Sequence, residues 1–141
     1  HLEQRMAFQA RVDRLPAVHA TTFEAKPEAL YQNAIGVVAM GGYNTFCEFL
    51  SFDKPALIVP RSEPRQEQLI RAERAARMGL LRILPEGENP QAEEMAAALH
   101  QIAEWPRPSK ELRARLLGGL DRIAELCAPV FEPTTRAASS A

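Results

Sequence analysis

Short apolar runs alternate with longer segments of helical spacing along the whole chain. The runs Val37–Met40 and Pro55–Pro60 are continuously apolar, which is typical of strands buried on both faces of a parallel sheet. Val18–Phe23, with three β-branched residues, and Leu80–Leu84 also predict short strands. Strands that alternate with helices in this way favour an α/β fold with a parallel sheet.

Helices are predicted between these strands because apolar residues recur there every three or four positions. They span Leu2–Leu15, Pro27–Ala34, Thr45 to about Ser51, Gln66–Met78, Pro90 to the break at Trp105–Pro108, and the segment from the cap Ser109 to about Cys127. Asn89 is expected to cap the helix that begins at Pro90. Gly118 and Gly119 interrupt the last helix and predict a kink or a break, since each costs about 1 kcal/mol relative to alanine.

The composition fits one domain with a sizeable core, because 46% of the 141 residues are hydrophobic. We expect this domain to span residues 1–128, and the Ser-, Thr- and Ala-rich residues 129–141 to form a flexible tail. The formal net charge is −1, with acids and bases interspersed, which argues against a nucleic-acid groove and a polybasic membrane anchor. Cys47 and Cys127 have no metal-binding spacing and are interpreted as reduced core thiols.

No apolar run approaches the length of a membrane span, and no signal peptide is visible. We therefore expect a cytoplasmic protein. The chain begins with His1 rather than Met, which is compatible with a fragment, a processed product or a shortened chain.

The stretch Gly36–Glu48 has the pattern of a strand, a glycine turn and a helix start. Gly41 and Gly42 permit backbone torsions and close approaches that a Cβ would prevent. The helix that follows directs its free N–H groups and its positive dipole end beyond the tip of the strand. A phosphate binds well at such a position.

Glu48 has two interpretations. Thr45 and Glu48 fit the capping-box pattern, in which the acid caps its own helix. Alternatively, a carboxylate beside a phosphate site suits the two adjacent hydroxyls of a ribose, because it has about four lone-pair sites on two oxygens. The local sequence leaves both open.

Two further loops follow the carboxyl ends of predicted strands, where ligands bind in such sheets. Glu24–Lys26 is short and can offer backbone groups to a flat base. Arg61–Gln68 is a polar cluster at a helix start. It is either a solvated first turn, which should point away from the glycine turn, or a set of donors and acceptors for sugar hydroxyls.

The sequence resembles the donor-binding half of a GT-B glycosyltransferase. The segments that carry the resemblance are Gly41–Glu48, Lys54–Pro60, Arg65–Gln68 and Gly79. The resemblance is strongest to the group that contains the N-acetylglucosaminyltransferase that makes lipid II, and within it to a bacterial set of predicted glycosyltransferases. It covers Val18–Leu84 well and the later helices loosely. It implies a Rossmann-like parallel sheet with flanking helices, the C-terminal half of a GT-B fold. Residues 1–128 would then be a partial nucleotide-sugar binding domain.

The resemblance implies a role for each matching residue. Glu48 would bind the ribose, and Phe23, Glu24 and Ala25 would contact the base through their backbone. The turn and helix start would face the diphosphate; they consist of Gly41, Gly42, Tyr43, Asn44 and Thr45. Arg65, Glu67 and Gln68 would contact the donor sugar. The family usually has Gln or Asp-Gln at the last two positions, so Glu67 departs from the pattern and leaves the sugar open.

The implied reaction is a metal-independent, inverting transfer. An acceptor hydroxyl attacks the anomeric carbon, and the nucleoside diphosphate leaves while helix N–H groups stabilise its growing charge. No metal or other cofactor is then required. The general base belongs to the N-terminal half, so no catalytic residue is assigned here. None of the three histidines, His1, His19 and His100, matches it, and His19 and His100 are expected to be structural or solvated.

The implied partners are a nucleotide-sugar donor, expected to be UDP-linked, and the N-terminal acceptor-binding half of the same enzyme. Membrane association of the full-length enzyme stays open. The family's donor half normally begins with two more strands and a glycine-rich loop. In the usual strand order 3-2-1-4-5-6, Val18–Phe23 would lack its neighbours here. This segment must therefore leave the sheet, pair in another way, or pair with another chain.

We therefore expect this chain to be inactive alone, as a fragment or as a subunit of a split enzyme, and a dimer through the unpaired sheet edge is conceivable. Two alternatives stay open. A sugar-nucleotide 2-epimerase on the same fold would need acids and histidines around the sugar. A non-catalytic module would bind the sugar nucleotide, or dock a subunit, without turnover.

Overall fold

The computed structural model describes residues 2–64, 66–84 and 92–131. Contacts divide the chain into two compact units, His1–Leu30 and Tyr31–Ala141, which are described separately. In the ranges described, no helix combines the length and the apolar character that a membrane span requires.

The first unit contains helix α1 (Leu2–Val12), of which only Val12 is buried. The strand expected at Val18–Phe23 is not formed, so that prediction is wrong. Thr21 makes local bonds there instead: its Oγ1 donates to the carbonyl oxygen of Phe23 at 2.8 Å and accepts from the Phe23 N–H at 3.4 Å. Such local bonds compete with strand ladders for the same backbone groups. The side chain of Phe23 is 81% exposed, so no packing opposes this local turn.

The second unit is built on three parallel strands in the order β1-β2-β3. They are β1 (Val37–Ala39), β2 (Ala56–Ile58) and β3 (Arg82–Ile83). Val38 pairs with Leu57, and Leu57 with Arg82. This confirms the predicted parallel α/β sheet, although each ladder is shorter than the apolar run that predicted it.

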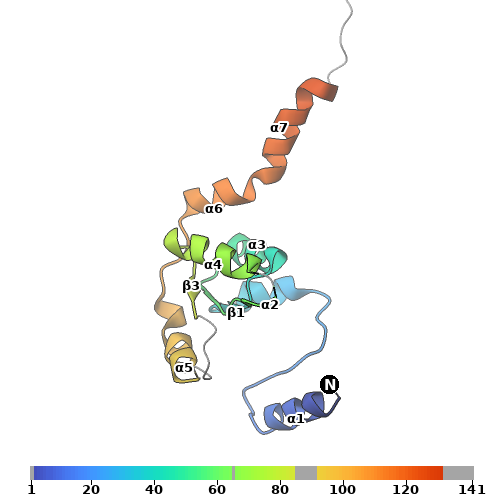
Figure 1. Cartoon of the computed structure of the whole chain (residues 1–141), viewed down its shortest axis with the longest axis vertical. Coiled ribbons are helices and arrows are strands. Elements are labelled where there is room, and N and C mark those ends of the chain that lie inside the picture. Colours follow the sequence, from blue (N-terminus) through green and yellow to red (C-terminus); the bar gives the residue numbers. More distant parts are fainter. Residues whose placement is uncertain (1, 65, 85–91, 132–141) are drawn as a thin grey trace, which may run out of the picture. The chain divides into compact units, whose positions relative to one another are not determined.

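Helices flank this sheet in the second unit, which is therefore a Rossmann-like arrangement (Figure 1). They are α2 (Pro27–Asn33, which begins in the first unit), α3 (Tyr43–Ser51), α4 (Glu67–Arg77), α5 (Ala92–Gln101), the 3₁₀ helix η1 (Ile102–Glu104), α6 (Lys110–Leu117) and α7 (Gly119–Phe131). The expected cap Asn89 and the helix start at Pro90 lie outside the described residues.

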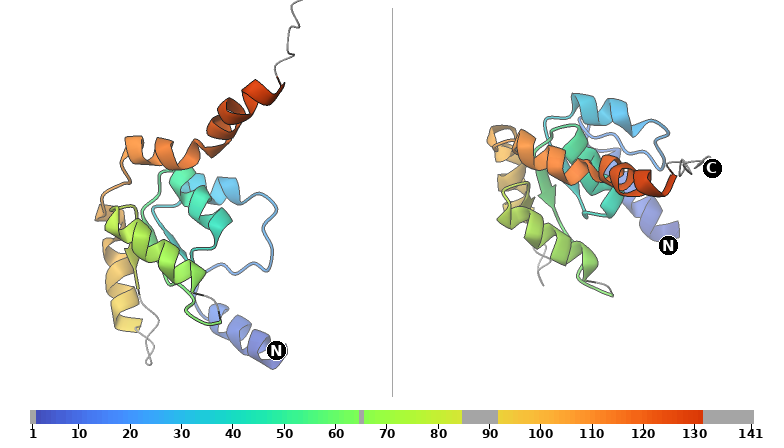
Figure 2. Two further views of the ribbon diagram at one scale, coloured as in Figure 1. Left: turned by 45° about the horizontal axis from the view of Figure 1, so that its top comes forward. Right: turned by 90° about the horizontal axis from the view of Figure 1, so that it is seen from above.

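The last two helices follow the sequence prediction closely. Ser109 caps α6, because its Oγ accepts from the Leu112 N–H at 3.3 Å. Gly118 separates α6 from α7, which confirms the predicted break. Helix α7 continues past Pro129, the residue at which the tail is expected to begin. Figure 2 shows α6 running across the end of α3, where Arg113 Nη1 donates to the carbonyl oxygen of Leu50 at 3.2 Å.

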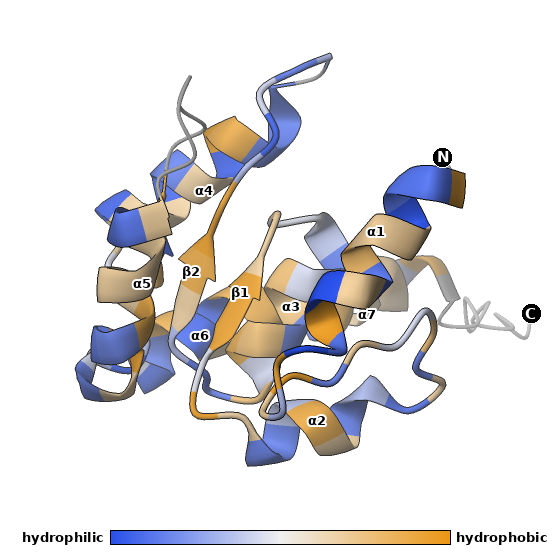
Figure 3. Ribbon diagram, turned by 90° about the horizontal axis from the view of Figure 1, so that it is seen from below, coloured by the Kyte–Doolittle hydropathy of each residue, from blue (hydrophilic) through white to orange (hydrophobic). Residues whose placement is uncertain are grey.

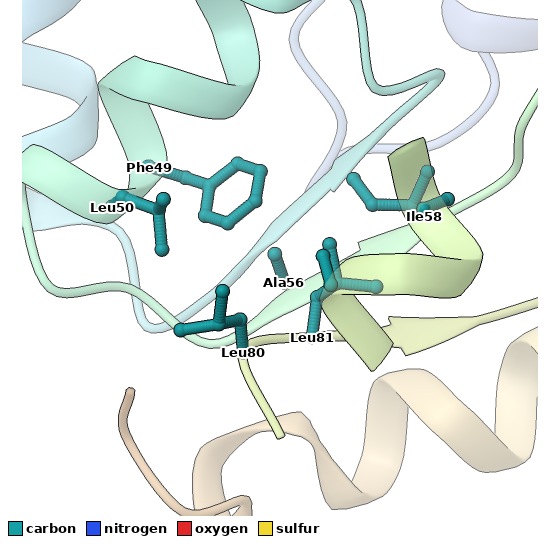
Figure 4. Close-up of a cluster of buried hydrophobic side chains, with 8 residues drawn as sticks. Phe49, Leu50, Ala56, Ile58, Leu80 and Leu81 are labelled. Atoms are coloured by element: carbon teal, nitrogen blue, oxygen red, sulfur yellow. The ribbon is translucent and has the colours of Figure 1, made fainter. Parts of the chain in front are cut away.

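One face of the sheet packs against α3 and α4. Ala56 and Ile58 of β2 point to this face because side chains alternate along a strand. The cluster that they join is fully apolar and is completed by Phe49, Leu50, Ala72, Ala75, Leu80 and Leu81 (Figure 4). This packing fixes the position of α3, and therefore of its N-terminus, relative to the strand tips.

The opposite face packs against α5 and η1. Leu57 points to this side and contacts a second cluster with Leu84, Ile102 and Trp105. Gly36 lies where β1 begins, and a Cβ there would be 2.5 Å from Ile102 Cδ1, so a larger residue would force the Ile102 side chain to shift. All three residues of β2 are therefore buried, as the continuous apolar run predicted.

β1 has a hydrogen-bonded neighbour on one side only within the described sheet. The Val37 N–H donates to Pro55 and the Ala39 carbonyl accepts from Val59, both toward β2. Backbone groups alternate in direction along a strand, so those of Val38 point to the outer edge. The Val38 side chain is 43% exposed, and Figure 3 shows β1 and β2 side by side in apolar colours.

Candidate functional site

The turn after β1 has the geometry that its glycines predict. Gly41 has a φ of +79°, and a Cβ there would lie 2.8 Å from Ile58 Cγ2. Both the left-handed backbone and the close approach to β2 therefore require glycine at this position. The turn leads the chain directly from the tip of β1 into α3.

Helix α3 begins at Tyr43, two residues before the expected cap Thr45, and its N-cap is Gly42. The capping-box prediction is therefore wrong, because Thr45 already lies inside the helix. The first helical hydrogen bond runs from the Phe46 N–H to the Gly42 carbonyl at 2.9 Å. The N–H groups of Tyr43, Asn44 and Thr45 precede it and have no intrahelical acceptor. Gly42 has no side chain to cap them.

Glu48 does not cap its helix but contacts α2. Its Oε2 accepts a hydrogen bond of 2.9 Å from the hydroxyl of Tyr31. Burial, then the hydrogen bond to Glu48 and its negative charge, raise the pKa of Tyr31 to about 12; a hydrogen bond with Thr45 acts in the opposite direction. One hydroxyl uses only one of the roughly four lone-pair sites of a carboxylate, so Glu48 keeps accepting capacity.

The predicted sugar contacts surround the start of α4. Glu67 is the first helical residue, and its carboxylate forms an ion pair with Arg71 Nη2. Gln68 Oε1 accepts from the Arg61 N–H at 3.3 Å. Arg65 lies outside the described residues. Both described residues of this group are therefore engaged by neighbouring protein atoms.

Arg71 joins this start of α4 to the glycine turn, a role that the sequence pattern does not predict. Its Nη1 donates to the Gly41 carbonyl oxygen at 2.9 Å, and its guanidinium carbon lies 5.6 Å from the centre of the Tyr43 ring. The first turn of α4 is thus beside the glycine turn, and not directed away from it as a purely solvated face would be. The i,i+4 spacing of Glu67 and Arg71 was the only signal in the sequence.

A cavity of about 650 Å³ lies between α3 and α4, and Leu116 of α6 contributes to its wall. This volume is in the range of small-molecule pockets. Its lining is mostly apolar and consists of Tyr43, Phe46, Gln66, Glu67, Ile70, Arg71, Arg74, Ala75, Met78, Leu80 and Leu116. Its wall therefore includes Tyr43, the first residue of α3.

The predicted site residues of the second unit fall on two sides of α3. At 100° per residue, Thr45 and Glu48 lie on the face opposite Tyr43 and Phe46. The helix start is common to both sides. The N–H groups at the helix start thus separate the side of Glu48 from the side that faces α4.

The residues predicted to contact a base belong to the first unit. Glu24 Oε1 accepts from the Lys26 N–H at 3.0 Å, which closes a local turn, and Phe23 and Ala25 are exposed. Their role stays a prediction. His19 and His100 are exposed as well, and His1 lies outside the described residues.

Three parallel strands with flanking helices, and a glycine turn that leads into an uncapped helix start, define a Rossmann-like α/β domain. The profile of the glycosyltransferase family 28 C-terminal domain matches residues 1–115. The chain belongs to this family, which supports a donor-binding role in a glycosyltransferase. No curated protein and no solved structure matches the chain significantly.

Proposed function

We propose that this chain is the donor-binding domain of a metal-independent, inverting glycosyltransferase that uses a nucleoside-diphosphate sugar, UDP-linked by preference. Membership of the family supports the donor-binding role. The observation that carries the proposal is the start of α3, where three N–H groups without a side-chain cap follow the glycine turn at the tip of β1.

The diphosphate would rest on the N–H groups of Tyr43, Asn44 and Thr45. As the glycosidic bond breaks, negative charge grows on the departing diphosphate, and prearranged N–H donors at a helix start stabilise it. The acceptor hydroxyl loses its proton to a base supplied by the N-terminal half of the enzyme. This chain therefore contributes leaving-group stabilisation and no catalytic base.

The other parts of the donor would bind to residues around the start of α3. Glu48 would accept hydrogen bonds from the ribose hydroxyls, and Phe23–Ala25 would contact the base. Glu67 and Gln68, with Arg65, would contact the sugar. Glu67 is ion-paired with Arg71, so a sugar hydroxyl there would share the carboxylate with a guanidinium.

Calorimetric titration of the chain with UDP-GlcNAc, UDP-glucose and GDP-sugars tests the proposal, with the chain alone and mixed with an N-terminal half. We expect binding of a UDP-sugar, and turnover only on mixing. Absence of binding in every mixture would overturn the proposal. Binding without turnover in every mixture would instead identify a non-catalytic module, and conversion of UDP-GlcNAc without an acceptor would identify an epimerase.

A further inference from the structure

Tyr31, in the last turn of α2, contacts the carboxylate proposed to hold the ribose. Its hydroxyl donates to Glu48 Oε2 at 2.9 Å, across 17 residues of sequence. Nothing in the sequence pattern singles out Tyr31, because the contact joins two different helices. The hydrogen bond is nevertheless made to the Glu48 carboxylate itself, and not to the backbone beside it.

The ring of Tyr31 is held independently of its hydroxyl. It stacks on Phe52, with 5.5 Å between ring centres and an angle of 4° between the planes. Phe52 is the C-cap of α3, so the same helix that carries Glu48 also fixes the ring. A second contact joins the same segments, since Lys54 Nζ donates to the Gln32 carbonyl oxygen at 2.9 Å. The hydroxyl is therefore presented to Glu48 from a fixed position.

A fixed donor matters for a carboxylate that binds a diol. A glutamate side chain is long and loses rotamer freedom when it is held in one geometry. A ligand that must order it loses affinity, whereas a side chain that is ordered beforehand avoids this cost. The Tyr31 hydroxyl orders Glu48 through one oxygen and leaves the other oxygen for hydroxyl groups.

We propose that Tyr31 is a positioning residue that holds Glu48 in the orientation that accepts the ribose hydroxyls, and that it thereby increases the preference for ribose over deoxyribose. The inference rests on the proposed function, because it requires that Glu48 bind the sugar ring. Tyr31 itself touches no substrate in this proposal. Its effect should be larger for ligands that carry both ribose hydroxyls than for ligands that keep only the 3′-hydroxyl.

The test is calorimetric titration of the full chain with UDP and with 2′-deoxy-UDP. The wild-type chain should bind UDP about tenfold more tightly, as expected for a hydrogen bond to a charged group. Tyr31→Phe keeps the ring and its stacking on Phe52 and removes only the hydroxyl. It should weaken UDP binding about three- to tenfold and weaken binding of 2′-deoxy-UDP, which keeps only the 3′-hydroxyl, by a smaller factor.

A double-mutant cycle separates positioning from structural support. In a Glu48→Gln background, Tyr31→Phe should change UDP affinity less than twofold. A merely structural tyrosine would instead weaken both nucleotides equally in either background, which would overturn the inference. An unchanged ribose preference in Tyr31→Phe would overturn the inference alone. A wild-type chain that binds neither nucleotide, or both equally, would overturn the ribose role of Glu48 and the inference with it.

Discussion

Arg71 donates a hydrogen bond of 2.9 Å to the carbonyl oxygen of Gly41, thirty residues away in the sequence. The same guanidinium pairs with Glu67 and lies over the ring of Tyr43. Arg71 is only 20% exposed, whereas Glu67 is 66% exposed. The bond to Gly41 is therefore the better shielded of the two contacts, and it fixes the glycine turn from the side of α4.

Replacement of Arg71 by Met should loosen the glycine turn. We expect a loss of about 1–2 kcal/mol in the free energy of unfolding, mainly from the shielded bond, because exposed ion pairs contribute little. Nucleotide affinity should fall several-fold as the turn becomes mobile. Urea unfolding and calorimetry measure the two effects. Arg77→Met, at an exposed position on the same helix and outside the cavity lining, is the control; equal effects of both variants would contradict the prediction.

Tyr43→Pro tests the helix N–H groups directly. Proline suits the first helical position, and Gly42 already has the extended torsions, φ −54° and ψ 152°, that a residue before proline adopts. The variant removes one N–H donor and leaves the helix intact. Tyr43→Ala is the control, since it loses the ring and keeps the N–H. UDP should bind about tenfold more weakly to the proline variant than to the alanine variant; equal affinities would exclude this N–H as a ligand.

The glycines of the turn should differ sharply in their tolerance of alanine. Gly41→Ala places a Cβ against Ile58 in a left-handed backbone and should lower the free energy of unfolding by about 2–4 kcal/mol. Gly42→Ala meets nothing within 4 Å at a negative φ and should be almost neutral. Denaturant unfolding of the two variants measures the difference. Similar stabilities would contradict the geometry of the turn.

Tyr31 predicts a loss of stability at high pH. Its pKa rises from the model-peptide value of 10.0 to about 12 in the folded chain. Between these values the unfolded chain loses the phenolic proton while the folded chain keeps it, so the free energy of unfolding falls as pH rises from 10 to 12. Below pH 10 the contribution is complete. Stability of wild type minus Tyr31→Phe, followed across this range, should show the decline; a flat difference would contradict it.

The outer edge of β1 predicts self-association of the chain. Val38 directs its backbone groups to the outer edge of the described sheet and has a partly exposed apolar side chain, and such an edge pairs readily with another strand. Sedimentation should show a concentration-dependent dimer that Val38→Lys weakens at least fivefold. Ile35→Lys, at a position 70% exposed and outside the strand, should leave the dimer intact. A chain that stays monomeric at all concentrations would contradict this.

The sequence predicts features that depend on local pattern. The apolar runs at β1 and β2, the Ser109 cap and the break at Gly118 are all set by near neighbours, and the structure confirms them. The glycine turn was also recognised from sequence. Two adjacent glycines after a strand predict such a turn, because few other residues tolerate a left-handed backbone.

What the sequence analysis missed depends on longer-range partners or on competing local bonds. At Val18–Phe23, where the sequence predicts a strand, Thr21 bonds to the backbone of Phe23 instead. Helix α3 has Gly42 as its N-cap and begins before Thr45, so both residues of the apparent capping box, Thr45 and Glu48, lie inside the helix. Tyr31 and Arg71 act on residues 17 and 30 positions away, and no periodicity reports such contacts.

The three residues of β2 belong to both hydrophobic clusters of the second unit, Ala56 and Ile58 to one and Leu57 to the other. The two clusters thus share the same peptide groups. A change in the packing of one cluster that displaces the backbone of β2 therefore also displaces side chains of the other cluster. We therefore expect helices α3 and α4, with the glycine turn, and the α5–η1 pair on the far side to unfold together, so that lost packing on either side would also disturb the proposed nucleotide site.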